Sequence, residues 1–93
     1  MRLSADTVKN AIDPEVYYRS QGVESKGKPN AKGWQSALCP LHGDNDPSLS
    51  INVKNGGFCC FGCGEKGGLI AFHALLNRMR FDEALDDLAR RFL

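Results

Sequence analysis

Two closely spaced pairs of metal-binding residue types constrain this chain more than any other feature of its sequence. Two residues separate Cys39 from His42, and two residues separate Cys60 from Cys63. A spacing of two lets one tight turn direct both side chains at one ion, and two such turns joined by a hairpin-length insert commonly build tetrahedral zinc sites. The sequence therefore predicts one structural, tetrahedral Zn²⁺ bound by Cys39, His42, Cys60 and Cys63.

The small size of the chain makes a structural metal more important. A domain of 93 residues buries only about 60–65% of the surface that its unfolded chain exposes, so chains of this size often add a metal, disulfides or a partner. Structural zinc contributes ~10–16 kcal/mol of apparent binding free energy in small finger peptides. We expect residues 1–93 to form a single domain whose fold depends on its metal.

Three alternatives stay open for the ligands and the thiols. His73 lies on a predicted helix beyond the second pair and could bind the metal. Cys59 could replace His42, although three residues separate it from Cys63 and strand alternation directs it away from Cys60. A redox role for Cys60 and Cys63 is disfavoured, because thioredoxin-like motifs lie in a βαβ pattern without a second ligand pair nearby.

The remaining sequence alternates between helix and strand patterns of an α+β domain. Ser4 can cap a first helix, and Asp13 followed by Pro14 marks the start of a second. Residues 23–33 read as a polar loop. Strands are predicted at 34–38, 48–53 and 57–61, with a hairpin turn at Asn55–Gly56. Helical spacing returns over 68–79 and in a last helix capped by Asp82, which predicts an antiparallel sheet flanked by N- and C-terminal helices.

Composition and motifs limit the function classes. The formal net charge is +1, so the distribution of charge rather than its sum must indicate any polyanion partner. No apolar run is long enough for a membrane span, and a reducing cytoplasm is the expected compartment, where clustered cysteines favour metal. The chain alone is not expected to be an enzyme, because the predicted zinc is saturated and the stretch GEKGG lacks the ending of a P-loop. The acidic residues of the last helix are expected to form a solvated face: Asp82, Glu83, Asp86 and Asp87.

The stretches CPLHGDNDPSLSINV and FCCFGCGEKGGLIAF resemble the zinc-binding domain of bacterial and phage DnaG-type DNA primases. The resemblance is dense over about 35 residues. It rests on the following residues: Cys39, Pro40, His42, Asp44, Pro47, Ser48, Cys60, Phe61, Gly62, Cys63, Gly64, Gly67, Ile70 and Phe72. Leu41, Leu49 and Gly68 depart from the family pattern, which suggests a phage, plasmid or mobile-element member.

The resemblance implies a zinc ribbon that engages single-stranded DNA template during primer initiation in DNA replication. It also implies that polymerisation belongs to a separate Toprim-type catalytic domain. This catalytic domain and a replicative helicase are the expected protein partners. Single-strand binding needs cations for phosphates and aromatic rings for base stacking. The candidate contacts are Lys26, Lys28, Lys32, Trp34, Lys54, Phe61 and Lys66. The alternative is a zinc-ribbon protein–protein adaptor of a phage, plasmid or mobile-element replication complex.

Overall fold

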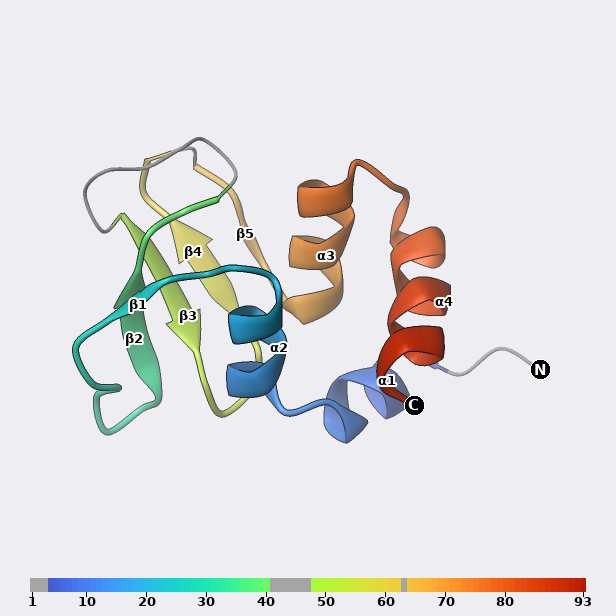
Figure 1. Ribbon diagram of the computed structural model, residues 1–93, viewed down its shortest axis with the longest axis horizontal. Helices are drawn as coiled ribbons and strands as arrows, with labels where there is room; N and C mark the ends of the chain where they lie inside the picture. The colour runs from blue at the N-terminus through green and yellow to red at the C-terminus, as the bar shows by residue number, and fades with distance from the viewer. Residues whose placement is uncertain (1–3, 41–47, 63) are drawn as a thin grey trace.

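Four helices and a five-stranded sheet make up the described part of the chain (Figure 1). The computed structural model describes residues 4–40, 48–62 and 64–93. The elements in chain order are α1 (Ala5–Ala11), α2 (Pro14–Ser20), β1 (Ser25–Lys26), β2 (Trp34–Ala37), β3 (Leu49–Asn52), β4 (Phe58–Cys60), β5 (Lys66–Gly67), α3 (Leu69–Asn77) and α4 (Phe81–Phe92). The predicted α+β architecture is confirmed.

The sheet is an antiparallel meander in which every strand pairs with its neighbours in sequence, in the order β1-β2-β3-β4-β5. Side chains alternate between its two faces. The buried apolar side chains of its inner face are Ala37, Leu49, Ile51, Phe58 and Cys60. In Figure 1, α2 lies in front of the sheet, while α3 and α4 lie beside it.

Aromatic rings join the helices to the inner face. Phe72 of α3 meets Phe58 of β4 with ring centroids 5.1 Å apart, and it meets Tyr18 of α2 at 4.9 Å, both edge to face. Such pairs contribute roughly 0.5–1.5 kcal/mol each beyond the area that they bury. Tyr18 also donates a hydrogen bond to the carbonyl oxygen of Gly56, so α2 is attached to the turn between β3 and β4.

The first two helices begin where the sequence predicts. The Oγ atom of Ser4 accepts a hydrogen bond from the backbone N–H of Thr7 at 3.2 Å. The Asp13 carboxylate accepts from the backbone N–H groups of Glu15 and Val16 at 3.0 and 3.4 Å, and Pro14 occupies the first position of α2. Both residues therefore satisfy donors that a helix start leaves without intrahelical partners.

Three sequence-based expectations need correction. The cap of α4 is Arg80 rather than Asp82, because Glu83 accepts from the Arg80 backbone N–H at 2.9 Å and starts the helix at Phe81. Asp87 does not join a solvated face, because it is buried against His73. The stretch predicted as a loop contains β1, whose two residues pair with Ser36 and Ala37.

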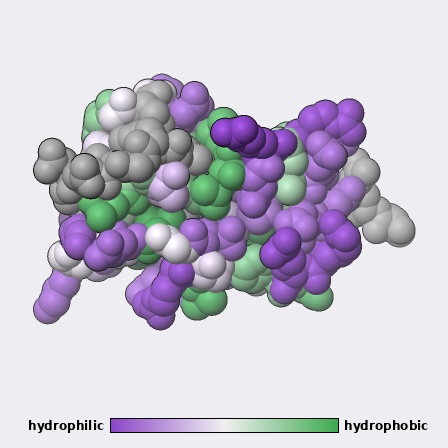
Figure 2. All heavy atoms as spheres, turned by 45° about the horizontal axis from the view of Figure 1, so that its top comes forward, coloured by the Kyte–Doolittle hydropathy of each residue, from purple (hydrophilic) through white to green (hydrophobic). Residues whose placement is uncertain are grey.

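The surface of the described residues is mixed. Figure 2 shows hydrophilic side chains over most of the helical half and apolar patches among them toward the sheet. The exposed large apolar side chains are Val16, Phe61, Leu75, Phe81 and Leu93. Within the described ranges, no helix combines the length and apolar character needed to cross a membrane.

Candidate zinc site and the outer face of the sheet

Cys39 and Cys60 lie near the same end of the sheet, and both are buried with 1% exposure. Cys39 follows β2, which ends at Ala37, and Ala37 pairs with Leu49 of β3. Leu49 in turn pairs with Cys60, the last residue of β4. The sheet register thus brings the first residue of each predicted ligand pair toward the same end of the sheet, although 20 residues lie between them in sequence.

The surroundings of Cys60 suit a metal ligand. Its backbone N–H donates to the carbonyl oxygen of Glu65 at 2.8 Å, and its own carbonyl accepts from the N–H of Gly64 at 2.9 Å. Its Sγ atom lies 3.6 Å from the hydroxyl oxygen of Ser48. Since zinc ligands are oriented by such neighbouring hydrogen bonds, this buried thiol fits a Zn–S bond.

The other two predicted ligands, His42 and Cys63, lie outside the described residues. Over residues 4–40, 48–62 and 64–93, no group of three or more Cys, His, Asp or Glu side chains is arranged to hold a metal ion. The ligand set therefore remains a prediction. Its two described members fit the soft, buried thiolate donors that zinc prefers.

The two adjacent cysteines occupy opposite faces of β4. Cys60 pairs with Leu49 on the inner face, whereas Cys59 pairs with Ser50 on the outer face and is half-buried. The prediction that Cys59 faces away from Cys60 is confirmed. The alternative that His73 binds the metal is disfavoured, because both ring nitrogens have protein partners. Its Nδ1 atom lies 2.7 Å from Tyr17 Oη, and its Nε2 atom lies 2.7 Å from Asp87 Oδ2.

One row of residues crosses the outer face of all five strands. Each member is the register partner of the next, so their side chains point to the same side. We call this set the outer row: Lys26, Ser36, Ser50, Cys59 and Lys66. Its ends are exposed lysines, and its middle is two hydroxyls and a thiol. With neighbouring strands about 4.8 Å apart, the row spans roughly 19 Å.

Trp34 lies on the same outer face, one pair of positions along β2 from Ser36. It is half-buried, and a Cβ atom placed on Gly57 would lie 3.7 Å from its Cη2 atom. The indole thus leans over a residue without a side chain. Phe61 follows β4 and is 79% exposed, so its ring is available at the other end of the sheet.

The predicted lysine contacts fall into two groups. Lys28, Lys32 and Lys66 are exposed and form no ion pair with another described residue. Lys26 pairs with Glu24 at 3.0 Å, but such exposed pairs contribute only about 0–1 kcal/mol. The Lys54 ammonium donates to the carbonyl oxygen of Ala31 at 2.9 Å and thereby fastens the loop before β2 to the β3–β4 turn.

Asn52 is a structural residue of this face that pattern reading did not reveal. It is 3% exposed, its Nδ2 donates to the Lys32 carbonyl, and its Oδ1 accepts from the backbone of Lys54 and Asn55. The role depends on the register that places Trp34 opposite Asn52. Alternation alone assigned Asn52 to the polar side, so only the pairing could have identified it.

These features define a small α+β zinc-finger domain with two buried thiols near one end of the sheet and exposed lysines on its outer face. The CHC2 zinc finger family matches residues 6–93. The chain belongs to this family.

Primases from several bacteria contain a similar segment. The DNA primases of Mycobacterium tuberculosis and Lactococcus lactis are 43% and 42% identical over 84 and 52 residues, which cover 90% and 56% of this chain. The chain spans only about a tenth of these relatives, 12% and 8% of their lengths.

A solved structure shows the same arrangement. The Aquifex aeolicus primase, described as comprising zinc-binding and RNA polymerase domains, matches 97% of this chain with a TM-score of 0.74 and 29% sequence identity. The match covers 22% of that chain, and it falls on the zinc-binding domain rather than the catalytic domain. The predicted relationship to DnaG-type primases is confirmed.

Proposed function

We propose that this domain binds single-stranded DNA across the outer row and, in doing so, presents template for replication priming. The observation that carries the proposal is the outer row itself, which places exposed Lys26 and Lys66 at the two ends of a polar strip. Single-strand binders combine a cationic groove for phosphates with aromatic side chains for bases. The polymerising chemistry would come from a Toprim-type catalytic domain, with which a replicative helicase could assemble.

Zinc would have a structural role. Cys39, His42, Cys60 and Cys63 would hold one ion with four protein ligands, which leaves no open position for a catalytic water. The ion would join the segment after β2 to the segment after β4. Phe61 lies directly beside Cys60, so the same site would fix the position of the most exposed aromatic ring among the described residues.

The bound strand would meet distinct side chains along its path. Lys26 and Lys66 would contact phosphates, while the hydroxyls of Ser36 and Ser50 would hydrogen-bond between them. Phe61 and Trp34 would stack on bases at opposite ends of the strands. Lys28 and Lys32 of the loop before β2 would add phosphate contacts, as would the remaining donors of Lys54.

Fluorescence anisotropy with labelled oligonucleotides tests the proposal on the zinc-loaded chain. If about three phosphates are neutralised, the logarithm of the affinity should fall with the logarithm of the salt concentration at a slope near −2, since each single-strand contact contributes about −0.7. A domain that binds no single strand at about 50 mM salt would contradict the proposal. The adaptor alternative would then gain weight.

Two matched pairs of variants separate stacking and phosphate contacts from general effects. Phe61→Ala should weaken binding by about 1–3 kcal/mol, whereas Phe81→Ala, which removes an exposed ring from the start of α4, should not. Lys66→Gln should make the salt dependence shallower by about 0.7. Arg78→Gln should leave it unchanged, because it removes an exposed cation, without an ion pair among the described residues, just after the C-terminus of α3. Equal losses within both pairs would count against the outer row.

The loop lysines provide a charge-reversal test that also addresses the adaptor alternative. Lys28→Glu with Lys32→Glu should abolish DNA binding because it replaces two attractive contacts by two repulsive ones. Docking onto a catalytic domain should survive the same change if these two loop lysines contact DNA and do not belong to a protein interface. Loss of docking with retained DNA binding would favour the adaptor.

A further inference from the structure

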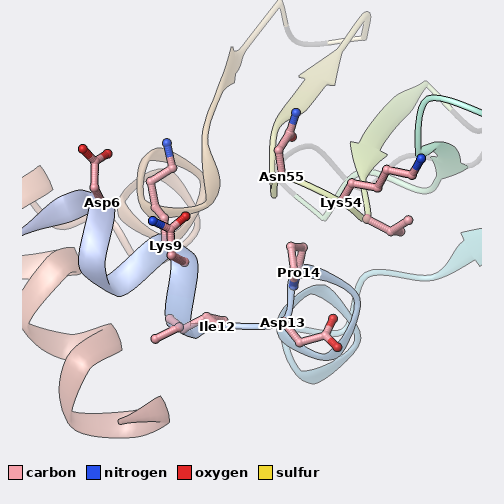
Figure 3. A pocket seen from close by; sticks show the side chains of 10 residues that line it. Asp6, Lys9, Ile12, Asp13, Pro14, Lys54 and Asn55 are labelled. Atoms are coloured by element: carbon pink, nitrogen blue, oxygen red, sulfur yellow. The ribbon is translucent and has the colours of Figure 1, made fainter.

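A polar groove separates the corner between α1 and α2 from the turn between β3 and β4. Its volume is about 640 Å³, within the range of roughly 300–1,000 Å³ that small ligands occupy. Figure 3 shows the α1 side chains Asp6 and Lys9 along one wall and Asn55 on the other. Asn10, Asp13 and Lys54 complete the polar lining.

The two walls are held together by contacts between their backbones and side chains. Tyr18 of α2 donates a hydrogen bond to the carbonyl oxygen of Gly56 in the turn. A Cβ atom on Gly56 would lie 3.7 Å from Pro14 and 3.1 Å from Leu69, so the turn packs closely on both α2 and α3. The groove is therefore part of the packed fold rather than a gap between independent loops.

Several polar groups in the groove are available to a ligand. Lys9 is exposed and pairs with no acid among the described residues. Asn55 accepts from the Gly57 backbone N–H through Oδ1 at 2.8 Å, which orients its amide and leaves the Nδ2 donors toward solvent. Asn10 adds a second exposed amide. One cation with two amides suits a phosphate together with the polar edge of a nucleobase.

The groove continues the outer face of the sheet. Gly57 joins them, because a Cβ atom there would lie 3.1 Å from Asn55 Oδ1 and 3.7 Å from Trp34 Cη2. Lys9 lies on the opposite wall of the groove. Its Nζ atom is 3.6 Å from where a Cβ atom on Gly68 would lie, and Gly68 is two residues after Lys66. The outer face at Trp34 and the groove at Asn55 are therefore neighbours across Gly57.

We propose that the groove binds the next nucleotide of the same single strand, with its phosphate at Lys9 and its base at Asn55 and Asn10. This inference rests on the proposed function and extends the path from the sheet to the N-terminal helices. The Asp13 carboxylate should repel a bound phosphate only weakly, because it caps α2 and its charge is partly balanced by the positive end of that helix. Asp6 also lies in the first turn of its helix, α1, but no hydrogen bond among the described residues holds its carboxylate there, so it should weaken binding.

Two substitutions on α1 with opposite expected effects test the groove. On oligothymidylates of about four to twelve nucleotides, Lys9→Gln should leave the shortest unaffected. It should weaken those long enough to reach the groove roughly threefold to tenfold, with a salt slope shallower by about 0.7. Asp6→Asn should tighten the long oligonucleotides. Arg78→Gln is the control for loss of an exposed positive charge.

The outcomes separate this inference from the proposed function. If Lys66→Gln weakens every length while Lys9→Gln matches Arg78→Gln at every length, the groove is not used and only the outer row binds DNA. If the unmodified chain binds no oligonucleotide, both proposals are wrong. An independent readout is the NMR signal of the Asn55 side-chain amide, which should shift with long oligonucleotides and stay unchanged with the shortest; no shift at any length overturns the groove.

Discussion

His73 of α3 and Asp87 of α4 form a buried hydrogen bond, with 2.7 Å between Nε2 and Oδ2 and side-chain exposures of 2% and 12%. The carboxylate can only accept, so Nε2 carries the hydrogen. The Nδ1 atom of the same ring lies within hydrogen-bonding distance of the phenol oxygen of Tyr17 in α2, also at 2.7 Å. Three helices therefore meet at one imidazole, and Arg91 adds a contact to Asp87 at 2.9 Å.

Asp87→Asn should destabilise the fold in a pH-dependent way. The hydrogen bond from His73, with help from Arg91, holds the pKa of Asp87 below its ordinary value of 3.8, against the opposing effect of burial. Because the folded pKa is depressed, the stabilisation is fully present above about pH 4 and is lost as the pH falls through the lower folded value. Urea unfolding near pH 7 should show a loss of about 1–3 kcal/mol for the variant.

The difference between variant and wild type is the quantity to follow, since zinc thiolates also protonate in acid and affect both proteins alike. Asp82→Asn is the control, because that carboxylate forms only an exposed contact with Arg80. If the difference in unfolding free energy between the wild type and Asp87→Asn shrank between pH 7 and pH 5, the low pKa of Asp87 in the folded state would be contradicted.

Local rules predicted much of the fold because the residues concerned act on their immediate neighbours. Ser4, Asp13 and Pro14 start helices through backbone groups within three positions. Asn55 and Gly56 lie in the connection between β3 and β4 as expected, but the turn is longer than these two residues, because Asn52 and Gly57 close it through the hydrogen bond from the Asn52 N–H to the Gly57 carbonyl oxygen. Alternation also separated Cys59 from Cys60 correctly. These signals do not require knowledge of the rest of the chain.

The features that sequence reading missed depend on partners far along the chain. Asp87 has the same local pattern as its acidic neighbours, and only its contact with His73, 14 residues earlier, buries it. The outer row requires the register of four strand pairs, which spacing in one strand cannot supply. The groove beside Lys9 likewise arises only when α1 packs near the β3–β4 turn.

Cys59→Ser and Cys60→Ser should differ sharply although the residues are adjacent. Cys60 is buried on the inner face beside Ser48, whereas Cys59 is half-buried on the outer face. Cys59→Ser should keep one zinc per chain and a native circular dichroism spectrum. Cys60→Ser should lose both, because a serine hydroxyl is a poor substitute for a thiolate ligand. Zinc stoichiometry by atomic emission decides between them, and loss of zinc in both variants would contradict the ligand assignment.

Removal of zinc should unfold the domain. The expected metal contribution of ~10–16 kcal/mol is as large as, or larger than, the whole net stability of about 5–15 kcal/mol typical of a domain. Titration with a high-affinity chelator should therefore abolish the near-ultraviolet circular dichroism of the aromatic cluster around Phe72. Added zinc should restore the signal. Full retention of the spectrum after complete chelation would show that the core folds without its metal.

Arg78→Gly should stabilise the protein. Arg78 ends α3 with φ 54° and ψ 48°, a left-handed conformation that costs a residue with a side chain roughly 1–2 kcal/mol. Glycine adopts it freely but loses more entropy on folding, so a net gain of about 0.5–1 kcal/mol is expected. The melting temperature should rise by several degrees. Arg78→Lys, which keeps the strain, is the control and should melt near the wild type.

Gly56→Ala and Gly22→Ala separate backbone strain from steric crowding. Both glycines have positive φ, 82° and 80°, so alanine is strained equally at each. A Cβ atom at Gly22 would meet nothing within 4 Å, whereas one at Gly56 would lie 3.1 Å from the Cβ atom of Leu69. Gly56→Ala should therefore cost about 1–3 kcal/mol more than Gly22→Ala, because the turn must move away from α3.

Thermal unfolding of the two zinc-loaded variants measures this difference, since 1 kcal/mol shifts the melting temperature of a domain of this size by about 4–8 °C. The displaced turn should also disturb the hydrogen bond from Tyr18 to Gly56 and with it the wall of the groove beside Lys9. Binding of long oligonucleotides should then weaken more in Gly56→Ala than in Gly22→Ala. Equal melting temperatures of the two variants would mean that the turn can move away from α3 without loss of stability. The groove would then not have a fixed shape.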